Sequence, residues 1–288
     1  MTTPFTPAGD LDEAASARLA DRLAQHELSI FVLGTTGETS SIPAPQRERL
    51  VRTAIRAADG RVPVYAGIGD NCVPDMIAAA RRYLDLGVAA VVAHAPCYYP
   101  LTREELQSCF ELLHREISGP LMLYNIPQTT DISLPLYLVE QLSELPGIVG
   151  FKDSEGTPGR LEETAARFAG RDEFAILMGS AVLSVAALKA GFDGLVPSSG
   201  NLVPEMWRQL WQHACAGEWD EAEQLQARLD AIGAVLQRNR TLGGYLAALK
   251  AALADQAVCT PDVLPPLRPL ADADRALIRS ELSALEVL

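Results

Sequence analysis

The stretch Ile148-Val149-Gly150-Phe151-Lys152-Asp153-Ser154 is a short apolar run that ends abruptly in charged and polar residues. Six more apolar runs of similar length occur in the first two-thirds of the chain, each followed by polar, Gly or Pro residues and then by a stretch with helical spacing. Continuous apolar runs predict strands that are buried on both faces, which is typical of a parallel sheet. The other six runs are Leu28–Leu33, Val62–Gly67, Val88–Ala93, Leu121–Tyr124, Phe174–Met178 and Phe192–Val196.

The alternation of strand-like runs with helical stretches indicates an α/β protein. Repeated strand–helix units form either a doubly wound sheet or a closed (β/α)8 barrel. A barrel needs an eighth strand, which would have to lie within the first residues of the chain, Met1–Phe5. In a barrel, the first strand of this chain would therefore be truncated.

After Asn201 the strand-like runs stop and four helical segments follow. The first segment would complete a barrel over residues 1–216, and the others predict a helical C-terminal extension over residues 217–288. The four segments are Trp207–Ala216, Glu218–Leu236, Leu242–Asp255 and Ala271–Leu285.

Local signals mark several helix starts. Thr102, with Glu105 three residues later, matches a capping box. Ser133 precedes Pro135, which suits the first turn of a helix. Two further prolines suit first-turn positions, where a backbone N–H would have no hydrogen-bond acceptor within the helix, so that its absence costs nothing. They are Pro45 and Pro74.

The composition excludes several classes of protein. Of 288 residues, 48% are hydrophobic and 21% charged, which is a globular balance, and the net charge of −13 is opposite in sign to that of a nucleic-acid binder. No apolar run approaches the roughly 20 residues that span a bilayer. The five cysteines show no C-x-x-C spacing, which indicates reduced thiols in a cytoplasmic protein. We therefore expect neither a nucleic-acid nor a membrane partner.

Lysine is scarce in this chain. Only three of the 24 basic residues are lysines, namely Lys152, Lys189 and Lys250. The chain uses arginine wherever a general positive charge is enough, so each lysine is a candidate for a task that arginine cannot perform. Losing a proton is such a task.

Polar residues gather at the ends of three predicted strands. The first run ends in Gly34-Thr35-Thr36-Gly37-Glu38, Tyr124 ends the fourth, and Lys152 ends the fifth. Each alone has an ordinary interpretation: a capped tight turn, a core tyrosine, and a lysine that reaches solvent. In a (β/α)8 barrel, however, catalytic groups come from the C-terminal ends of several strands. The combination therefore favours a common site.

The chemistry of these residues is that of imine formation with a keto acid. An amine attacks a carbonyl only when neutral, so the pKa of Lys152 would have to fall from about 10.4 towards 7–8 through desolvation. The resulting imine is an electron sink for breaking or making a C–C bond. The Tyr124 hydroxyl can shuttle a proton, and the hydroxyls of Thr35 and Thr36 with loop amides can hold a carboxylate. Such chemistry needs no cofactor beyond the covalent imine.

These motifs resemble those of the dihydrodipicolinate synthase / N-acetylneuraminate lyase family. The resemblance spans nearly the whole chain and rests on three motifs in the family's order and spacing: Gly34-Thr35-Thr36-Gly37-Glu38, Tyr124-Asn125-Ile126-Pro127 and Gly150-Phe151-Lys152-Asp153. It implies a (β/α)8 TIM barrel, a class I aldolase mechanism and a homotetramer built as a dimer of dimers.

The resemblance also implies roles for individual residues. Lys152 would form the imine with pyruvate or another 2-keto acid, and Tyr124 would relay the proton. Thr35 and Thr36 would bind the substrate carboxylate. Thr35 would also link Tyr124 to Tyr98, which the family lends to a neighbouring subunit. The backbone near Val196 and the turn at Gly179 would complete the pocket.

Some positions depart from the synthase pattern. Thr129 stands where the synthases carry an arginine that holds the carboxylate of the aldehyde partner, and a neutral hydroxyl cannot replace a bidentate guanidinium. Cys97 and Ala44 stand where the synthases' lysine-feedback site usually has Tyr and His. The stretch Pro96-Cys97-Tyr98-Tyr99-Pro100 is more similar to the lyase branch, and Lys152-Asp153-Ser154 to hydroxy-oxoglutarate and keto-deoxy sugar-acid aldolases.

These departures favour reversible cleavage of a 2-keto-3-deoxy or 4-hydroxy-2-keto acid to pyruvate and an aldehyde. Two alternatives remain open: a dihydrodipicolinate synthase that lacks the usual arginine, and a non-catalytic keto-acid binder that kept the pocket. A metal-dependent aldolase would need clustered ligands, and the four histidines are scattered. They are His26, His94, His114 and His213.

Overall fold

The computed structural model describes residues 1–288, which form two compact units. One unit comprises Met1–Val64 with Ser198–Leu288, and the other comprises Tyr65–Pro197. The predicted boundary between residues 216 and 217 falls where one helix ends, at Ala216, and shortly before the next begins, at Trp219. The division into barrel and extension stays a prediction.

The seven predicted strands are all present, and they follow one another in chain order in a seven-stranded sheet. Each pair of neighbouring strands from β2 to β7 is parallel. This confirms the α/β class and the reading of continuous apolar runs as buried parallel strands. The strands are β1 (Ile30–Val32), β2 (Val64–Gly67), β3 (Ala90–His94), β4 (Leu121–Asn125), β5 (Ile148–Asp153), β6 (Ala175–Met178) and β7 (Gly194–Leu195).

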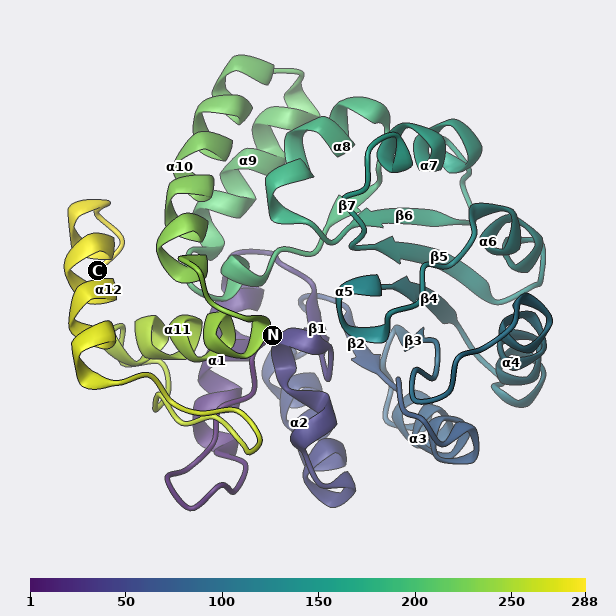
Figure 1. Cartoon of the computed structure of the whole chain (residues 1–288), viewed down its shortest axis with the longest axis horizontal. Coiled ribbons are helices and arrows are strands. Elements are labelled where there is room, and N and C mark those ends of the chain that lie inside the picture. Colours follow the sequence, from purple (N-terminus) through teal and green to yellow (C-terminus); the bar gives the residue numbers. More distant parts are fainter. The chain divides into compact units, whose positions relative to one another are not determined.

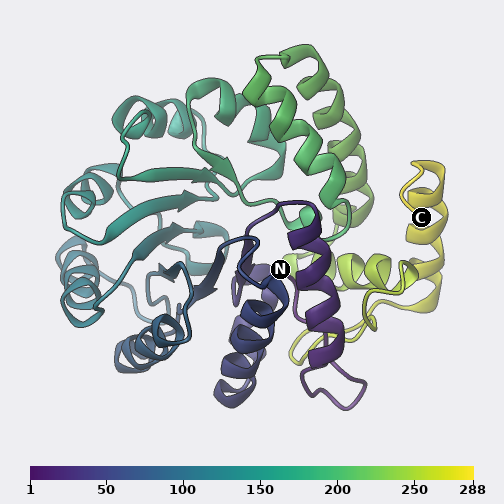
Figure 2. The same ribbon diagram turned by 180° about the vertical axis from the view of Figure 1, so that it is seen from behind.

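In the unit Tyr65–Pro197, helices alternate with strands, and the longer helices lie along the outside of the sheet (Figures 1 and 2). This is the arrangement expected of successive βαβ crossovers, in which each helix covers the strands it connects. The helices of this unit are α3 (Val73–Asp85), α4 (Arg103–Glu116), α5 (Pro127–Thr130), α6 (Leu136–Ser143), α7 (Arg160–Phe168) and α8 (Ser184–Ala190).

The other unit is mainly helical. Its helix α11 is apolar nearly all round, and every residue from Leu246 to Leu253 is buried, as expected for a helix enclosed on all sides. The last three C-terminal helices lie within one residue of their predicted bounds, whereas α9 begins three residues before its predicted start at Trp207. The helices of this unit are α1 (Glu13–Gln25), α2 (Ala44–Ala58), α9 (Pro204–Ala216), α10 (Trp219–Gln237), α11 (Leu242–Asp255) and α12 (Asp272–Ala284).

The predicted helix starts are confirmed in all but one case. Thr102 caps α4 with Glu105 in a complete capping box, and α2 and α3 each carry proline in the first two positions. The exception is the predicted helix start at Ser133 with Pro135 in the first turn, which was wrong. Helix α6 begins at Leu136, so Pro135 is its N-cap rather than a first-turn residue, and the Ser133 hydroxyl donates instead to Glu155.

No eighth strand is formed by Met1–Phe5. The segment is nevertheless held within its unit: the Met1 nitrogen donates to the Phe31 carbonyl of β1 at 2.5 Å, and the Thr3 hydroxyl donates to the Gly37 carbonyl at 2.7 Å. The only bridge is the antiparallel contact of Phe5 with Leu11. Single contacts of this kind tether an extended segment without making a ladder.

None of the helices combines the length and the apolar character that a bilayer crossing requires.

Candidate active site

Lys152 lies near the C-terminal end of β5 and is only 6% exposed. Its register partner on β4 is Tyr124, so the two side chains project from the same face of the sheet. The Lys152 Nζ atom lies 3.8 Å from the centre of the Tyr124 ring. The predicted pairing of amine and phenol at neighbouring strand ends is therefore present in the structure.

The turn after β6 brings Gly179 directly against Lys152. A Cβ atom at Gly179 would lie 3.1 Å from Lys152 Cε and 1.9 Å from Ser154 Oγ, so only glycine leaves room for these side chains. The Gly179 N–H donates to the Asp153 carbonyl at 2.7 Å. This close approach is the physical reason for glycine at that position.

His94 extends the same row of side chains onto β3, where it pairs in register with Tyr124. The two rings meet edge to face with their centres 6.5 Å apart. The His94 Nδ1 atom lies 2.8 Å from the Ala95 carbonyl, which can only accept, so Nδ1 carries the proton. No role for His94 follows from the sequence, although its place just after the predicted strand Val88–Ala93 was a signal.

The His94 imidazole is held in its neutral form. Burial lowers its pKa below the usual 6.5, and the Ala95 carbonyl and the charge of Asp70 only partly oppose this shift. The ring also packs on Gly69, where an added Cβ would lie 2.1 Å from His94 Nε2. A neutral, tightly held ring thus lies beside the phenol of Tyr124.

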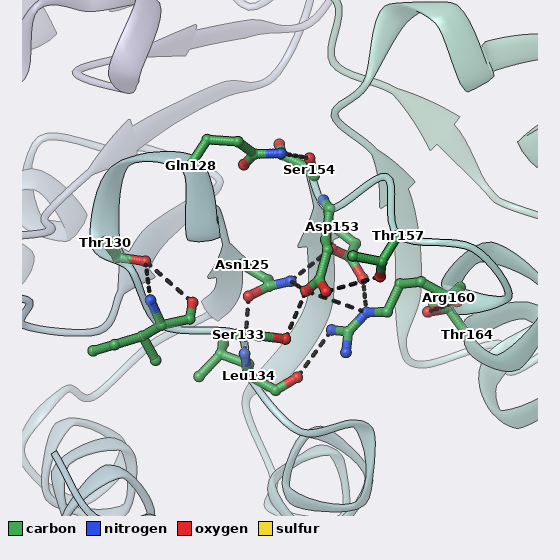
Figure 3. Close-up of polar contacts among 12 residues, drawn as sticks. Asn125, Gln128, Thr130, Ser133, Leu134, Asp153, Ser154, Thr157, Arg160 and Thr164 are labelled. Carbon is green, nitrogen blue, oxygen red and sulfur yellow. Dashed lines mark hydrogen bonds and ion pairs between the residues drawn. The ribbon is translucent and has the colours of Figure 1, made fainter. Parts of the chain in front are cut away.

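The residues that directly follow Tyr124 and Lys152 form a buried polar network (Figure 3). Asn125 Nδ2 donates to Asp153 Oδ1 at 2.8 Å and to Glu155 Oε2 at 2.9 Å. Arg160 Nε donates to Asp153 Oδ2 at 2.8 Å. Because successive strand residues point to opposite faces, this network joins the ends of β4 and β5 on the face away from Lys152.

The same network fastens the loop that follows β4. Asn125 Oδ1 accepts from the Leu134 N–H at 2.9 Å, and the Arg160 guanidinium donates to the Leu134 carbonyl at 2.9 Å (Figure 3). Burial alone would raise the pKa of Glu155, but hydrogen bonds from its neighbours, first Ser133, and the charge of Arg160 lower it below its usual value. Glu155 is therefore ionised at neutral pH.

The remaining predicted residues of this unit lie in different settings. Tyr98 is 76% exposed on the loop after β3, in edge-to-face contact with Tyr99. The Thr129 hydroxyl, in the short helix α5, donates to the Ile126 carbonyl at 3.3 Å. The Val196 N–H donates to the Met178 carbonyl at 2.8 Å, so this amide continues the sheet. The structure does not place Tyr98 in contact with Lys152.

Thr35 and Thr36 belong to the other unit, where they begin a single 3-10 turn, Thr35–Gly37, directly after β1. The Thr36 hydroxyl lies 2.8 Å from the Ser198 hydroxyl. Glu38, which ends the turn, adopts a left-handed backbone conformation with φ 57° and is buried. The turn is therefore closely held, although no side chain caps its N-terminal end.

No group of three or more His, Cys, Asp or Glu side chains has an arrangement that could hold a metal ion.

The chain as a whole is similar to known proteins. The model of the "Dihydrodipicolinate synthetase family" matches residues 1–285. The 4-hydroxy-tetrahydrodipicolinate synthase of Nitrosomonas eutropha is 31% identical over 230 residues, which are 80% of this chain and 78% of that protein. The synthase of the same name from Alkalilimnicola ehrlichii is 29% identical over 283 residues, covering 98% and 95% of the two chains.

A solved structure is also closely similar. YagE, a prophage protein of the dihydrodipicolinic acid synthase family from E. coli K12, was solved in complex with pyruvate. It matches with a TM-score of 0.94 and 28% identity, over 100% of this chain and 97% of that one.

Proposed function

Because the chain belongs to the dihydrodipicolinate synthetase family, we propose that it reversibly cleaves a 2-keto-3-deoxy or 4-hydroxy-2-keto acid into pyruvate and an aldehyde. The family comprises class I aldolase-type enzymes that break or make carbon–carbon bonds, and the protein is an enzyme of that kind. The observation that carries the more specific proposal is the buried Lys152 amine against the ring of Tyr124.

The proposed reaction begins with attack of the neutral Lys152 Nζ on the C2 carbonyl of the keto acid. Water leaves, and the protonated imine then draws electrons from the C3–C4 bond. As that bond breaks, the C4 hydroxyl gives its proton to Tyr124 and the aldehyde departs. The remaining enamine takes up a proton at C3, and water hydrolyses the imine to release pyruvate.

The other predicted residues bind and orient the substrate in this proposal. The hydroxyls of Thr35 and Thr36 hold the C1 carboxylate by donating hydrogen bonds to it. Hydrogen bonds suffice because the carboxylate keeps its negative charge throughout the reaction. Thr35 also relays the proton between Tyr124 and Tyr98, and the exposed Tyr98 belongs to the site of a neighbouring subunit. The assembly is a homotetramer.

Three further positions complete the substrate pocket and decide which aldehyde is bound. They are Thr129, Gly179 and Val196. Thr129 supplies a hydroxyl and no positive charge, which favours a polyhydroxy or small neutral aldehyde over one that carries a carboxylate.

A second candidate function is 4-hydroxy-tetrahydrodipicolinate synthase, the activity in the names of the curated relatives. It requires condensation of pyruvate with aspartate semialdehyde, whose carboxylate would meet Thr129 instead of an arginine. A non-catalytic keto-acid binder is the third candidate. It would form the imine with Lys152 and release no product.

The deciding experiment is a panel of 2-keto-3-deoxy and 4-hydroxy-2-keto acids assayed for pyruvate release, beside the synthase reaction. Wild-type protein should release pyruvate from at least one of the acids, and borohydride with pyruvate should leave a covalent adduct on Lys152. The Lys152→Ala variant should do neither, whereas the matched control Lys189→Ala should do both. Efficient condensation with aspartate semialdehyde and no cleavage of the panel would instead establish the synthase.

A further inference from the structure

Lys250 is a second buried lysine, and it lies on α11 (Figure 1). Its side chain is 0% exposed and its ammonium is fully surrounded. Lys250 Nζ lies 2.5 Å from Glu38 Oε1, donates to the Asp262 carbonyl at 2.7 Å and lies 4.0 Å above the centre of the Phe5 ring. Burial lowers the pKa of Lys250, and the charge of Glu38 opposes that shift.

The partner of Lys250 is the last residue of the Gly34–Glu38 motif. Glu38 uses its second oxygen, Oε2, to accept from the Leu264 N–H at 2.9 Å. Its own N–H donates to the Thr35 carbonyl at 3.1 Å. The carboxylate therefore connects the turn with Thr35 and Thr36 to a lysine of α11 and to the segment that follows α11.

A second contact connects the same helix to the same turn. The hydroxyl of Tyr245 on α11 hydrogen bonds to Ser198, and the Ser198 hydroxyl lies 2.8 Å from the Thr36 hydroxyl. Burial raises the pKa of Tyr245 to about 12, so its hydroxyl keeps its proton. A chain of three hydroxyls thus runs from α11 to the side chain of Thr36.

We propose that α11 positions the Thr35–Thr36 turn for the carboxylate of the keto acid, through Lys250 on Glu38 and through Tyr245 and Ser198 on Thr36. Lys250 and Tyr245 are thus positioning residues that touch neither the substrate nor the reacting atoms. This inference rests on the proposed function, because it assumes that the turn binds a carboxylate.

Binding of the carboxylate depends on how precisely the two hydroxyls of the turn are placed. Two neutral hydroxyls bind a carboxylate well only when their oxygens are held within a fraction of an ångström of their positions. Glu38 has φ 57°, a conformation that a non-glycine residue keeps only when its surroundings enforce it. The buried ion pair fixes the backbone conformation of Glu38 at one end of the turn, and the hydroxyl chain orients the side chain of Thr36.

A role in stability, with none in substrate binding, would be enough to explain the ion pair of Lys250 with Glu38. It does not explain the hydroxyl chain, because Ser198 and Tyr245 could be replaced by apolar groups at little cost if they served only packing. Their arrangement directs a donor or acceptor towards Thr36 specifically. The inference therefore predicts an effect on substrate binding that exceeds any effect on the chemical step.

The first test uses Tyr245→Phe, which removes one hydroxyl and keeps the ring. The KM for the keto acid should rise about tenfold, the effect of losing one well-placed hydrogen bond, with kcat changed by less than about threefold. Tyr137→Phe, on the exposed side of α6, is the matched control and should leave both constants unchanged. An unchanged KM in Tyr245→Phe, or an equal fall in kcat, would overturn the proposal.

The second test replaces the ion pair. Because Lys250→Met alone would leave the Glu38 charge buried and unpaired, the variant to examine is the double substitution Glu38→Gln with Lys250→Met, which removes both charges. It should keep a wild-type circular dichroism spectrum and raise KM about tenfold, with an unchanged rate of borohydride trapping at saturating keto acid. Lys189→Met is the control. A folded double variant with wild-type KM would contradict the role of the pair.

The two tests separate this inference from the proposed function. If wild-type protein forms no borohydride adduct with pyruvate and cleaves no keto acid, the proposed function is wrong and the inference falls with it. If wild-type protein is active and either variant keeps the wild-type KM, only the inference is wrong.

Discussion

Tyr124 is the residue whose role can be separated most cleanly from that of Lys152. Its ring lies against the Lys152 amine, so removal of the hydroxyl leaves the packing at that amine intact. Tyr124→Phe should therefore still form the imine with pyruvate, while kcat for cleavage falls by about 10²–10⁴, the usual contribution of a general acid or base. Mass spectrometry after borohydride reduction measures the first, and pyruvate release measures the second. A kcat within a few-fold of wild type would exclude Tyr124 as the proton acceptor.

His94 predicts a dependence of stability on pH. Burial lowers its pKa in the folded protein below the usual value of 6.5. Just below pH 6.5 the unfolded chain therefore binds more protons at this residue than the folded protein does, so stability falls as the pH is lowered from 6.5 through the folded-state pKa. The melting temperature of wild type, measured from pH 7 to pH 5, should decrease more steeply than that of His94→Gln. Parallel curves for the two proteins would show that His94 does not titrate in this range.

Among single residues, Lys152 and Tyr124 were predictable from the sequence because each ends a recognisable apolar run. No role for His94, Asp153 or Arg160 followed from the sequence. The contacts of His94 and Asp153 depend on the register of β3, β4 and β5, and the contact of Arg160 depends on the position of the start of α7 beside Asp153. A lone histidine after a strand is more often structural, and local sequence alone does not decide between the two cases.

Among the elements, the ends of β4 and β5 are joined by a network that a single substitution can break. Arg160 is the only guanidinium that donates to the buried carboxylate of Asp153, and it also faces Glu155 at 3.8 Å. Arg160→Met would leave two carboxylates without their counter-charge. We expect a loss of about 3–5 kcal/mol in the free energy of unfolding, the usual cost of breaking a buried pair. Urea denaturation monitored by circular dichroism measures this loss.

The matched control for that prediction is Arg167→Met on the same helix, α7. Arg167 pairs with Glu140 and Glu163 at the surface, where water and salt screen the interaction. Its loss should be far smaller than that of Arg160. Equal losses in the two variants would show that the network contributes no more than a surface ion pair.

The elements themselves were largely predictable. All seven strands, the capping box of α4 and the four C-terminal helices follow from local patterns of apolar residues and caps. The exception at α6 is instructive, because Ser133 has the chemistry of a helix cap. The Ser133 hydroxyl donates instead to the carboxylate of Glu155, which lies in the loop after β5, 22 positions away in the chain. Competition from a distant acceptor therefore overrode a local preference.

For the whole molecule, the proposed homotetramer predicts a mass in solution. Light scattering on the purified protein should give about four times the 31.0 kDa of one chain. Tyr98 and Tyr99, 76% and 72% exposed in the single chain, are large apolar side chains of the kind that subunit contacts cover. Tyr98→Ala should lower kcat without unfolding the chain. A fully active species with the mass of one chain would contradict both the assembly and the role of Tyr98.

Sequence by itself determined the α/β class, the positions of the strands and helices, and the pairing of an amine with a phenol at neighbouring strand ends. Those features depend on periodicity and on caps, which act over a few residues. Only the tertiary structure decided that α11 holds the Thr35–Thr36 turn, that His94 joins the row of Tyr124 and Lys152, and that Met1–Phe5 forms no strand. Contacts such as Glu38 with Leu264, 226 positions apart, depend on how buried segments pack, and packing couples residues that no local pattern relates.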